Sequence, residues 1–197
     1  AFILQQRKRT LTAWVLHGVE GTGKGIMMNR ILRPIFGKEQ TALRRMEELN
    51  EPYNSYMKKC FIVFIDEVES KALMNERGVM AKLRTFITEP FVTIRDMYSS
   101  AVEWENFCNW IFSSNKPEPV LIPQEDRRFN VGKYQTQKLG MDDTELAKIP
   151  GELQAFHDYL LSYPVDTTAV ATPLDNEDRS TMIQVAESSN DTVAGKI

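Results

Sequence analysis

The chain contains 197 residues, of which 42% are hydrophobic and 26% charged, and its formal net charge is -3. These values are typical of a soluble globular protein with one domain and an appendage, and they exclude a chain too small to bury a sizeable core. Such a chain has no overall attraction for nucleic acid, so any such contact requires a local basic patch, and no apolar run is long enough to span a membrane.

The first ten residues, AFILQQRKRT, look more like the middle of a helix than a natural start. We therefore expect residues 1–10 to be the end of a truncated helical segment of a larger protein. The short basic run at residues 5–9 either contacts phosphate or faces solvent.

Residues 18–25, GVEGTGKG, fit the phosphate-binding pattern G-x-x-x-x-G-K. An apolar run with β-branched and aromatic members at residues 12–17 predicts a buried strand before the loop. Apolar residues at helical spacing after the loop predict a helix whose end is limited by Pro34 and Gly37. In this arrangement, backbone N–H groups and a helix N-terminus converge on anionic oxygens. We assign nucleotide binding to Gly18, Glu20, Gly21, Thr22, Gly23, Lys24, Gly25 and Ile26.

Gly25 departs from the usual pattern, in which Ser or Thr follows the lysine and binds magnesium. If a carboxylate elsewhere anchors the metal, water can replace this one ligand of about six. Thr22 inside the loop is a speculative substitute. The glycine also costs about 1 kcal/mol of helix propensity relative to alanine. The sequence predicts a working but atypical site.

The next two elements are predicted to be a helix and a buried strand. Residues 41–57 have apolar side chains at helical spacing, with an interruption at Pro52. Residues 60–65 form a near-continuous apolar run, which is typical of a central parallel strand buried on both faces. Asp66 and Glu67 follow at the carboxyl end of this strand, where ligands bind in open α/β sheets.

Asp66 and Glu67 are the predicted acidic half of the site. Asp66 would hold magnesium, directly or through water, and Glu67 would orient and deprotonate the attacking water. The alternative is that the pair only caps a helix, because Asp is a good N-cap residue. The glycine loop upstream favours the catalytic interpretation.

Residues 91–107 are predicted to form a β-hairpin, after a helix with apolar residues between Met80 and Ile87. Arg95 could neutralise a phosphate, and Tyr98 in the turn could stack on a base. The alternative, which is slightly favoured, is that Tyr98 is a half-buried aromatic of the hairpin.

Two further polar groups are candidates for the site. Asn115 follows a predicted strand at residues 110–112, and its amide could bond the attacking water or a phosphate, although composition alone favours a simple turn. Arg127 and Arg128 precede another short strand. A guanidinium at a subunit edge can stabilise phosphoryl transfer in a neighbouring site. The alternative is a solvated pair or a salt bridge with an adjacent carboxylate.

The remaining sequence divides into helices and a tail. Asp143 or Thr144 is the expected N-cap of a first helix, and a Pro-Gly break at residues 150–151 precedes a second. The expected division of the chain is residues 1–10 as the truncated segment, 11–140 as a P-loop ATPase core, 141–163 as C-terminal helices, and 164–197 as a polar and acidic tail, partly disordered or the start of a missing element.

Five segments in order resemble the superfamily 3 helicases, a branch of the AAA+ ATPases, and most closely the primase-helicase proteins of phages, plasmids and large DNA viruses. They are GVEGTGKG, EPYNSYMKKCFIVFIDEV, ITEPFVTIRDMYSSAVEWENF, WIFSSNK and DRRFNV, within residues 11–132. The resemblance implies an α/β fold, a three-layer P-loop NTPase of AAA+ type with a parallel central sheet, an inserted β-hairpin and a C-terminal helical segment.

The resemblance also implies an activity: hydrolysis of ATP with Mg²⁺ to move on single-stranded DNA. It further implies a hexameric ring in the full-length protein, a fused or associated primase-polymerase, no membrane, and the cytosol of a bacterium or phage-infected host. The matched residues are Lys24 for the phosphate-binding lysine, Asp66 and Glu67 for the acidic pair, Asn115 for the polar sensor, and Arg127 or Arg128 for the trans-acting finger.

One departure from the family concerns DNA. The family hairpin usually has a lysine near its tip, whereas here Arg95 is the nearest cation, so weak DNA contact through Arg95 and Tyr98 is expected. Two alternatives to the motor remain open: an inactive AAA+ scaffold that binds nucleotide without turnover, and a small-molecule kinase that shares the phosphate loop.

Overall fold

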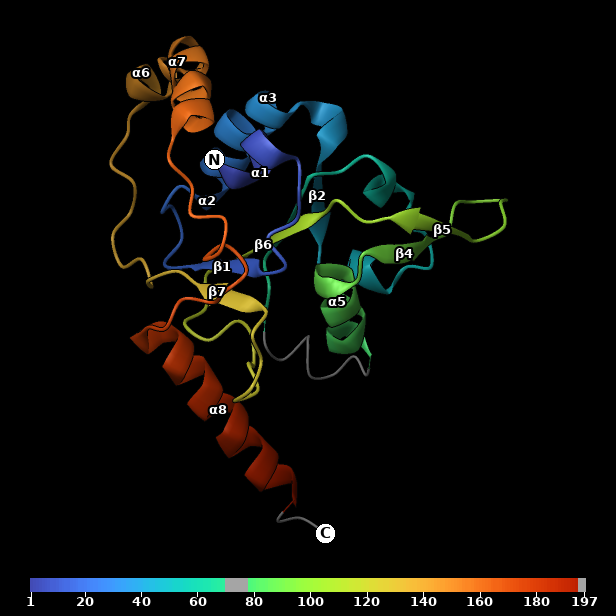
Figure 1. Cartoon of the computed structure of the whole chain (residues 1–197). Helices are drawn as coiled ribbons and strands as arrows, with labels where there is room; N and C mark the ends of the chain where they lie inside the picture. The colour runs from blue at the N-terminus through green and yellow to red at the C-terminus, as the bar shows by residue number, and fades with distance from the viewer. Residues whose placement is uncertain (70–77, 195–197) are drawn as a thin grey trace.

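A sheet of five parallel strands forms the centre of the molecule (Figure 1). The computed structural model describes residues 1–69 and 78–194, with side chains described through residue 188. The strand order is β2-β3-β6-β1-β7. The strands are β1 Ala13–His17, β2 Thr41–Arg45, β3 Ile62–Asp66, β6 Asn109–Ser114 and β7 Phe129–Val131. The α/β class and the parallel central sheet that the sequence predicts are therefore confirmed.

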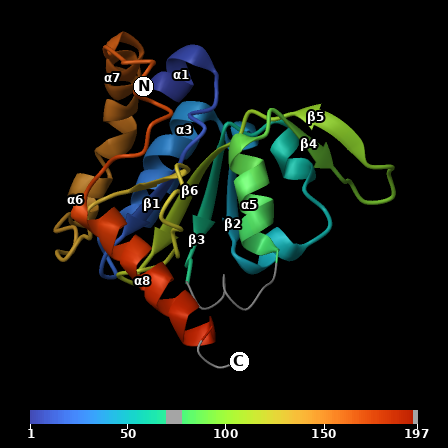
Figure 2. The same cartoon turned by 60° about the horizontal axis from the view of Figure 1, so that its bottom comes forward.

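Helices and loops cover both faces of the sheet. Successive side chains of a strand point to opposite faces, and β3 places apolar side chains on both, so each face needs a cover. Ile62 and Phe64 pack in one cluster, together with residues of the helix after β1. Val63 and Ile65 belong to the larger cluster on the other face, over which α5 (Val79–Thr88) lies. Figure 2 shows α1 (Phe2–Gln6) and α7 (Ile149–Ser162) on the opposite side of the sheet from α5.

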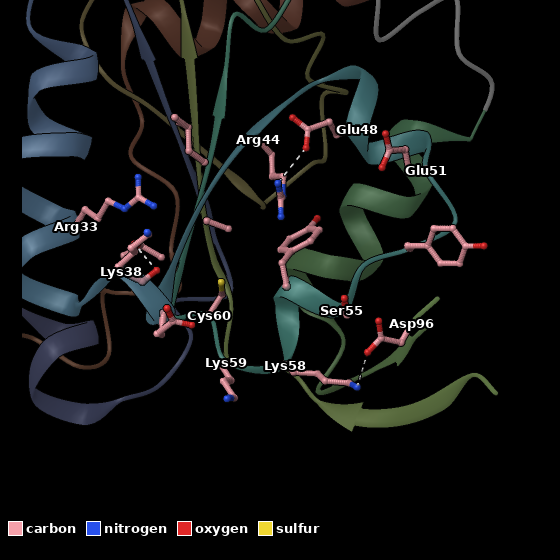
Figure 3. A pocket seen from close by; sticks show the side chains of 16 residues that line it. Arg33, Lys38, Arg44, Glu48, Glu51, Ser55, Lys58, Lys59, Cys60 and Asp96 are labelled. Carbon is pink, nitrogen blue, oxygen red and sulfur yellow. Dashed lines mark hydrogen bonds and ion pairs between the residues drawn. The ribbon is translucent and has the colours of Figure 1, made fainter. Parts of the chain in front are cut away.

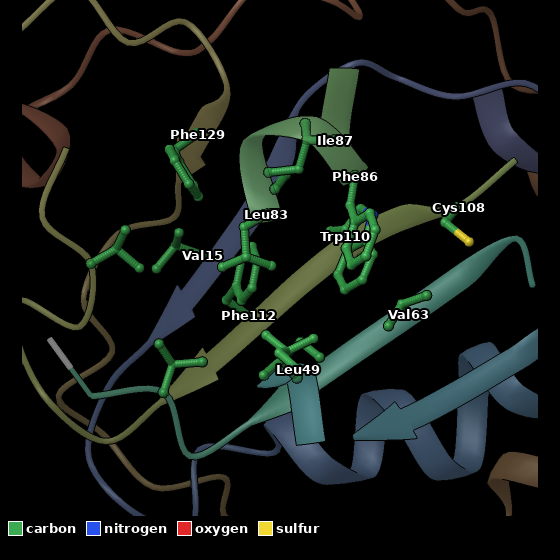
Figure 4. Close-up of a cluster of buried hydrophobic side chains, with 14 of the residues drawn as sticks. Val15, Leu49, Val63, Leu83, Phe86, Ile87, Cys108, Trp110, Phe112 and Phe129 are labelled. Atoms are coloured by element: carbon green, nitrogen blue, oxygen red, sulfur yellow. The ribbon is translucent and has the colours of Figure 1, made fainter. Parts of the chain in front are cut away.

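The larger cluster is built around aromatic side chains of β6 (Figure 4). Trp110 stacks on Phe86 of α5 with 5.6 Å between ring centroids, and it also stacks on Phe112 of the same strand. Leu83 and Ile87 of α5 are each 2% exposed. The four-residue spacing of Leu83 and Ile87 brings one face of α5 onto the sheet, as the sequence predicts for this helix. Residues 70–77, shortly before this helix, lie outside the described residues.

The segment after the glycine loop is helical from Lys24 to Phe36. It consists of α2 (Lys24–Ile26), a π-helical turn η1 (Met27–Leu32) and α3 (Arg33–Phe36). Pro34 lies inside this segment and does not end it. The end comes at Gly37, whose φ of 91° no other residue type adopts readily.

Residues 41–45 form strand β2, so the prediction of a helix over residues 41–57 is wrong there. β2 pairs with β3 in register from Thr41–Ile62 to Arg45–Asp66. Met46 and Leu49 still enter the core, Leu49 from the 3-10 turn η3 (Glu47–Asn50) and Met46 from the residue directly before it. Burial of these two residues explains why the apolar spacing resembles that of a helix. Two other 3-10 turns flank the region, η2 (Lys38–Gln40) and η4 (Ser55–Lys58).

The predicted hairpin is present as β4 (Phe91–Ile94) and β5 (Val102–Glu105), an antiparallel pair outside the central sheet. The favoured interpretation of Tyr98 as a half-buried aromatic is wrong, because its side chain is 98% exposed in the turn. Tyr98 also has a φ of 60°, in the left-handed region that non-glycine residues rarely adopt. The tip therefore presents this ring entirely to solvent.

The C-terminal part contains α6 (Asp143–Leu146), α7 and α8 (Glu177–Ala194). The N-cap of α6 is Asp142, one residue before the predicted position, because its carboxylate and Glu145 form a capping box. Pro150 lies in the first turn of α7, where it needs no hydrogen-bond acceptor. Segment 164–197 contains α8, and its Met182 is fully buried against the core. None of the described helices is long and apolar enough to cross a bilayer.

Candidate functional site

The glycine loop leaves the carboxyl end of β1 and is held from outside by residues 134–139, which we call the strap. The backbone N–H of Val19 donates to Gln135 O at 2.8 Å, and that of Leu139 donates to Gly21 O at 2.8 Å. A Cβ at Gly18 would lie 2.5 Å from Gln135 O, and one at Gly23 would lie 2.9 Å from Leu139 Cδ2. The close approach of the strap therefore requires glycine at position 18, where the contact is with backbone, and the φ of 90° favours glycine at position 23.

Lys24 begins the helix that follows the loop, and its ammonium folds back onto the loop. Its Nζ donates to Gly18 O at 2.9 Å, to Val19 O at 3.2 Å and to Thr22 Oγ1 at 3.0 Å. Burial lowers the pKa of Lys24 below its ordinary value, and the nearby charge of Asp66 opposes that shift. The ammonium is therefore positioned inside the loop and close enough to Asp66 for their charges to interact.

Asp66 is the last residue of β3, and Glu67 follows it in an uncommon conformation. Glu67 has a φ of 56°, which costs roughly 1–2 kcal/mol for a residue with a Cβ. Its backbone N–H donates to Asp66 Oδ1 at 3.1 Å. Strained backbone of this kind often occurs at functional sites. The Glu67 side chain is exposed, whereas that of Asp66 is half-buried.

A pocket of about 470 Å³ brings the loop and the acidic pair together. Strand β6 lies between β1 and β3 in the sheet, and Asn115 follows its carboxyl end. Asn115 therefore enters the pocket between Lys24 and the carboxylates. The predicted site residues that line the pocket are Gly21, Thr22, Gly23, Lys24, Gly25, Ile26, Asp66, Glu67 and Asn115.

Three lining residues are additions to the predicted set. Asn29 and Arg30 lie one helical turn after Gly25 and Ile26, and Ser113 lies in β6. The side chain of Asn29 donates to Gly25 O at 3.1 Å. Asn29 and Arg30 could have been predicted from the helical spacing after the loop, because residues three and four positions apart lie on the same face of a helix. Arg30 supplies a second cation to the pocket.

A second cavity of about 450 Å³ borders the acidic pair from another side. Asp66, Glu67 and Asn115 line both cavities. Lys116 adds a cation to the second cavity and forms a 3.8 Å ion pair with Glu69. The two carboxylates therefore stand between the phosphate-loop pocket and a second opening.

The structure does not bring every predicted residue to this pocket. Gly18 and Glu20 do not line it. Arg127 and Arg128 precede β7, which runs parallel to β1, so they lie at the amino ends of the strands, the opposite end from Lys24. Arg95 and Tyr98 belong to the separate hairpin.

The two arginines differ in their surroundings. Arg128 Nη1 lies 3.3 Å from Asp126 Oδ2, and Arg84 pairs with the same buried carboxylate at 3.2 Å. Arg127 is exposed, and its side chain has no ion pair among the described residues. Arg128 is therefore committed to a contact inside the chain, as the salt-bridge alternative anticipated, and Arg127 is available to a partner.

The sequence profile of a family of unknown function, DUF5906, matches residues 16–128. This span holds the glycine loop, the acidic pair, Asn115 and both arginines, and it covers more than half of the chain. The chain belongs to the DUF5906 family.

A relative of this DUF5906 chain comes from a phage. The DNA primase-polymerase of Nitratiruptor phage NrS-1 is 30% identical over 191 residues, which are 95% of this chain and 26% of that protein. Structures of the NrS-1 C-terminal region superpose with TM-scores of 0.83 and 0.81 at 29% identity over 94% of this chain. The chain spans 45% and 44% of those structures. It is therefore homologous to part of a phage replication protein.

Proposed function

We propose that this chain is the ATP-hydrolysing motor domain of a phage-type replication protein, of the P-loop, AAA+ and superfamily 3 helicase class, and that it moves on single-stranded DNA. The observation that carries the proposal is the shared pocket of Lys24, Asp66, Glu67 and Asn115. These four residues come from the carboxyl ends of three adjacent parallel strands, the edge at which open α/β sheets bind ligands.

The loop supplies the phosphate-binding part of this mechanism. The first N–H groups of the helix that starts at Lys24 have no acceptor within the helix, so they are free to bond anionic oxygens. A phosphate would draw the Lys24 ammonium away from the loop oxygens that it now contacts, because a charged acceptor forms the stronger hydrogen bond. Arg30 would add a second positive charge from the next helical turn.

Asp66 fits a magnesium ion shared with the nucleotide. Among the side chains described in residues 1–69 and 78–188, no group of three or more His, Cys, Asp or Glu could hold a metal. Mg²⁺ commonly takes one or two carboxylates together with phosphate and water oxygens, and Asp66 lies beside the phosphate loop. Bound there, the ion would neutralise charge on the phosphates. Glu67 would accept a proton from water, and the Asn115 amide would orient that water.

Arg127 would complete the site of a neighbouring copy. It lies at the opposite end of the sheet from its own Lys24, so it can act only between subunits. The cavity beside Asp66 and Glu67 gives an exposed guanidinium a path to the phosphates. A contact of this kind between copies is compatible with a ring. The hexameric state and a fused or associated primase-polymerase partner are what the resemblance implies.

A scaffold that binds nucleotide without turnover is the second candidate. Two observations favour it: Gly25 offers no hydroxyl for magnesium, and Lys24 is satisfied by three oxygens of its own loop. A kinase acting on a small molecule is the third alternative, for which transfer of phosphate to a metabolite would be the evidence.

Steady-state ATP turnover with and without single-stranded DNA tests these alternatives. The motor requires Mg²⁺-dependent turnover that DNA stimulates, loss of that turnover in Lys24→Ala, and its survival in Gly25→Ser. The serine is the matched control, because a Cβ at Gly25 meets no atom within 4 Å. Turnover that persists at the wild-type rate in Lys24→Ala would show that the assignment is wrong, and binding without turnover would favour the scaffold.

A further inference from the structure

A groove with a volume of about 840 Å³ lies along the outer side of β2, the edge strand of the sheet. Figure 3 shows the side chains that line it. The groove shares no lining residue with the pocket of the phosphate loop. Asp96, in the turn between β4 and β5, forms part of its rim, so the groove reaches from the edge of the sheet to the turn of the hairpin.

Lysines gather at one end of the groove, where Glu39 and Asp96 lie beside them, and Arg44 lies with Glu48 at the other end. Lys38 precedes β2, and Lys58 and Lys59 precede β3. Since the two strands are parallel, these lysines gather at the amino ends of the strands, and Figure 3 shows them along one rim. Glu48 and Glu51 lie at the other end of the groove in the same view.

Some of these cations form salt bridges, and others form none with the described residues. Lys58 pairs with Asp96 at 3.3 Å, and Arg44 pairs with Glu48 at 3.1 Å. Lys38, Lys59 and Arg33 form no salt bridge with any residue in the described part of the chain. Lys38 and Lys59 are exposed. Glu39, next to Lys38 in the same turn, offsets only part of this charge.

Arg7 extends the cationic rim toward β1. Its Nη1 donates to Gln40 Oε1 at 3.0 Å, and Gln40 is in the turn that also holds Lys38. The Arg7 guanidinium lies over the ring of Phe61, 5.2 Å from its centroid. The basic run near the start of the chain, which the sequence leaves between phosphate contact and solvent, thus lies beside the groove.

Two partly exposed aromatic rings, one of them beside a lysine, lie along the groove. Tyr53 lines the groove and is 42% exposed. Trp104 of the hairpin is also 42% exposed, and its indole N–H donates to Lys58 O at 3.2 Å. The Lys58 ammonium lies 5.8 Å from the centroid of the Trp104 ring. Cations that track a backbone, interleaved with exposed rings that stack on bases, are what single-strand binding requires.

We propose that this groove binds a single-stranded polynucleotide, with phosphates along Arg7, Lys38 and Lys59 and bases against Tyr53 and Trp104. This groove would be a second site of contact with the strand, in addition to the hairpin tip. The identification of the ligand as a polynucleotide rests on the proposed function, whereas the binding of a polyanion rests on the cations of the groove alone. The net charge of -3 makes such a local patch necessary for this ligand.

The test is fluorescence anisotropy with labelled DNA and RNA oligonucleotides of equal length at several salt concentrations. Lys38→Glu with Lys59→Glu should weaken binding by at least about tenfold at low salt. The loss of two phosphate contacts should also make the negative slope of log K against log salt shallower by about 1.4. The matched control is Lys133→Glu with Lys148→Glu, two exposed lysines elsewhere, which makes the same change in net charge. Its slope should stay at the wild-type value.

The alanine pair Lys38→Ala with Lys59→Ala keeps the test valid if charge reversal disturbs folding, and it should show the same fall in slope. Equal behaviour of the groove and control pairs would overturn the proposal, as would a wild-type protein that binds neither oligonucleotide. A stronger response to DNA or to RNA identifies which polynucleotide is bound.

Binding of a fluorescent ATP analogue, measured on the same samples, should be unchanged in both pairs because none of the four lysines lines the nucleotide pocket. Oligonucleotide binding without nucleotide binding would refute the proposed function and leave the groove in place. If nucleotide binds but the groove substitutions leave oligonucleotide binding unchanged, the groove proposal is refuted and the proposed function is not.

Discussion

Replacement of Gly18 by alanine tests the contact between the glycine loop and the strap. The new Cβ would lie 2.5 Å from Gln135 O and 2.9 Å from Gln135 Cα, both backbone atoms that no rotamer change can move. Overpacking of this kind costs about 1–3 kcal/mol. Displacement of the strap would also weaken the hydrogen bonds from Val19 N to Gln135 O and from Gln135 N to His17 O, at about 1 kcal/mol each.

The expected loss for Gly18→Ala is therefore about 3–5 kcal/mol in the free energy of unfolding, measured by urea denaturation. For a domain of this size, such a loss lowers Tm by roughly 2–4 °C per kcal/mol. Gly25→Ala is the matched control, since its Cβ meets no atom within 4 Å and alanine is the better helix former. Its stability should be equal to wild type or greater by up to about 1 kcal/mol. A Gly18→Ala protein within about 0.5 kcal/mol of wild type would refute the close approach.

Three further outcomes follow from the described contacts. Burial raises the pKa of Cys60 to about 11 and raises that of Cys108 further, so the folded state keeps protons that unfolded thiols release near pH 8.5. The free energy of unfolding should therefore fall as pH rises from about 9 through 11, and urea titrations at pH 8 and pH 10 measure this fall. Cys60→Ala should reduce the fall, and an unchanged fall in that variant would contradict the role of this thiol. Asp126→Asn removes the charge that Arg84 and Arg128 share and should lower the free energy of unfolding by about 2 kcal/mol, a value that allows for the partial exposure of both arginines. Thermal melts should show this loss, and they should show little change in the control Arg127→Ala. Equal melts for the two variants would count against the network. Tyr98→Ala should keep the free energy of unfolding within about 0.5 kcal/mol of wild type, since the ring is 98% exposed. The same variant should weaken oligonucleotide binding in the anisotropy assay. A clear loss of stability would show that the ring packs against the protein.

The carboxyl-end site could be predicted in large part from the sequence. The strands β1, β3 and β6 are short apolar runs, and each is followed directly by polar or glycine residues. Because parallel strands end at the same edge, Lys24, Asp66 and Asn115 were expected near one another, and they line one pocket. Their roles in catalysis stay predictions until the proposed assays are done.

Other parts of the site depend on contacts between distant segments. Gln135 and Leu139 hold the glycine loop from more than a hundred residues away, and no local pattern marks them. The choice between Arg127 and Arg128 depends on the buried carboxylate of Asp126 and on Arg84 in α5. Such pairings are set by packing and not by spacing along the chain.

By itself, the sequence determined the α/β class, the glycine loop, the buried strands and the hairpin, because each depends on a run of neighbouring residues whose periodicity and turn chemistry are local. The tertiary structure decided that residues 41–45 are a strand, since pairing with β3 outweighs a helical spacing of apolar residues. It also decided which cations share a surface. Arg7, Lys38 and Lys59 precede three different strands, and only the parallel sheet, by aligning the amino ends of those strands, brings them together beside β2.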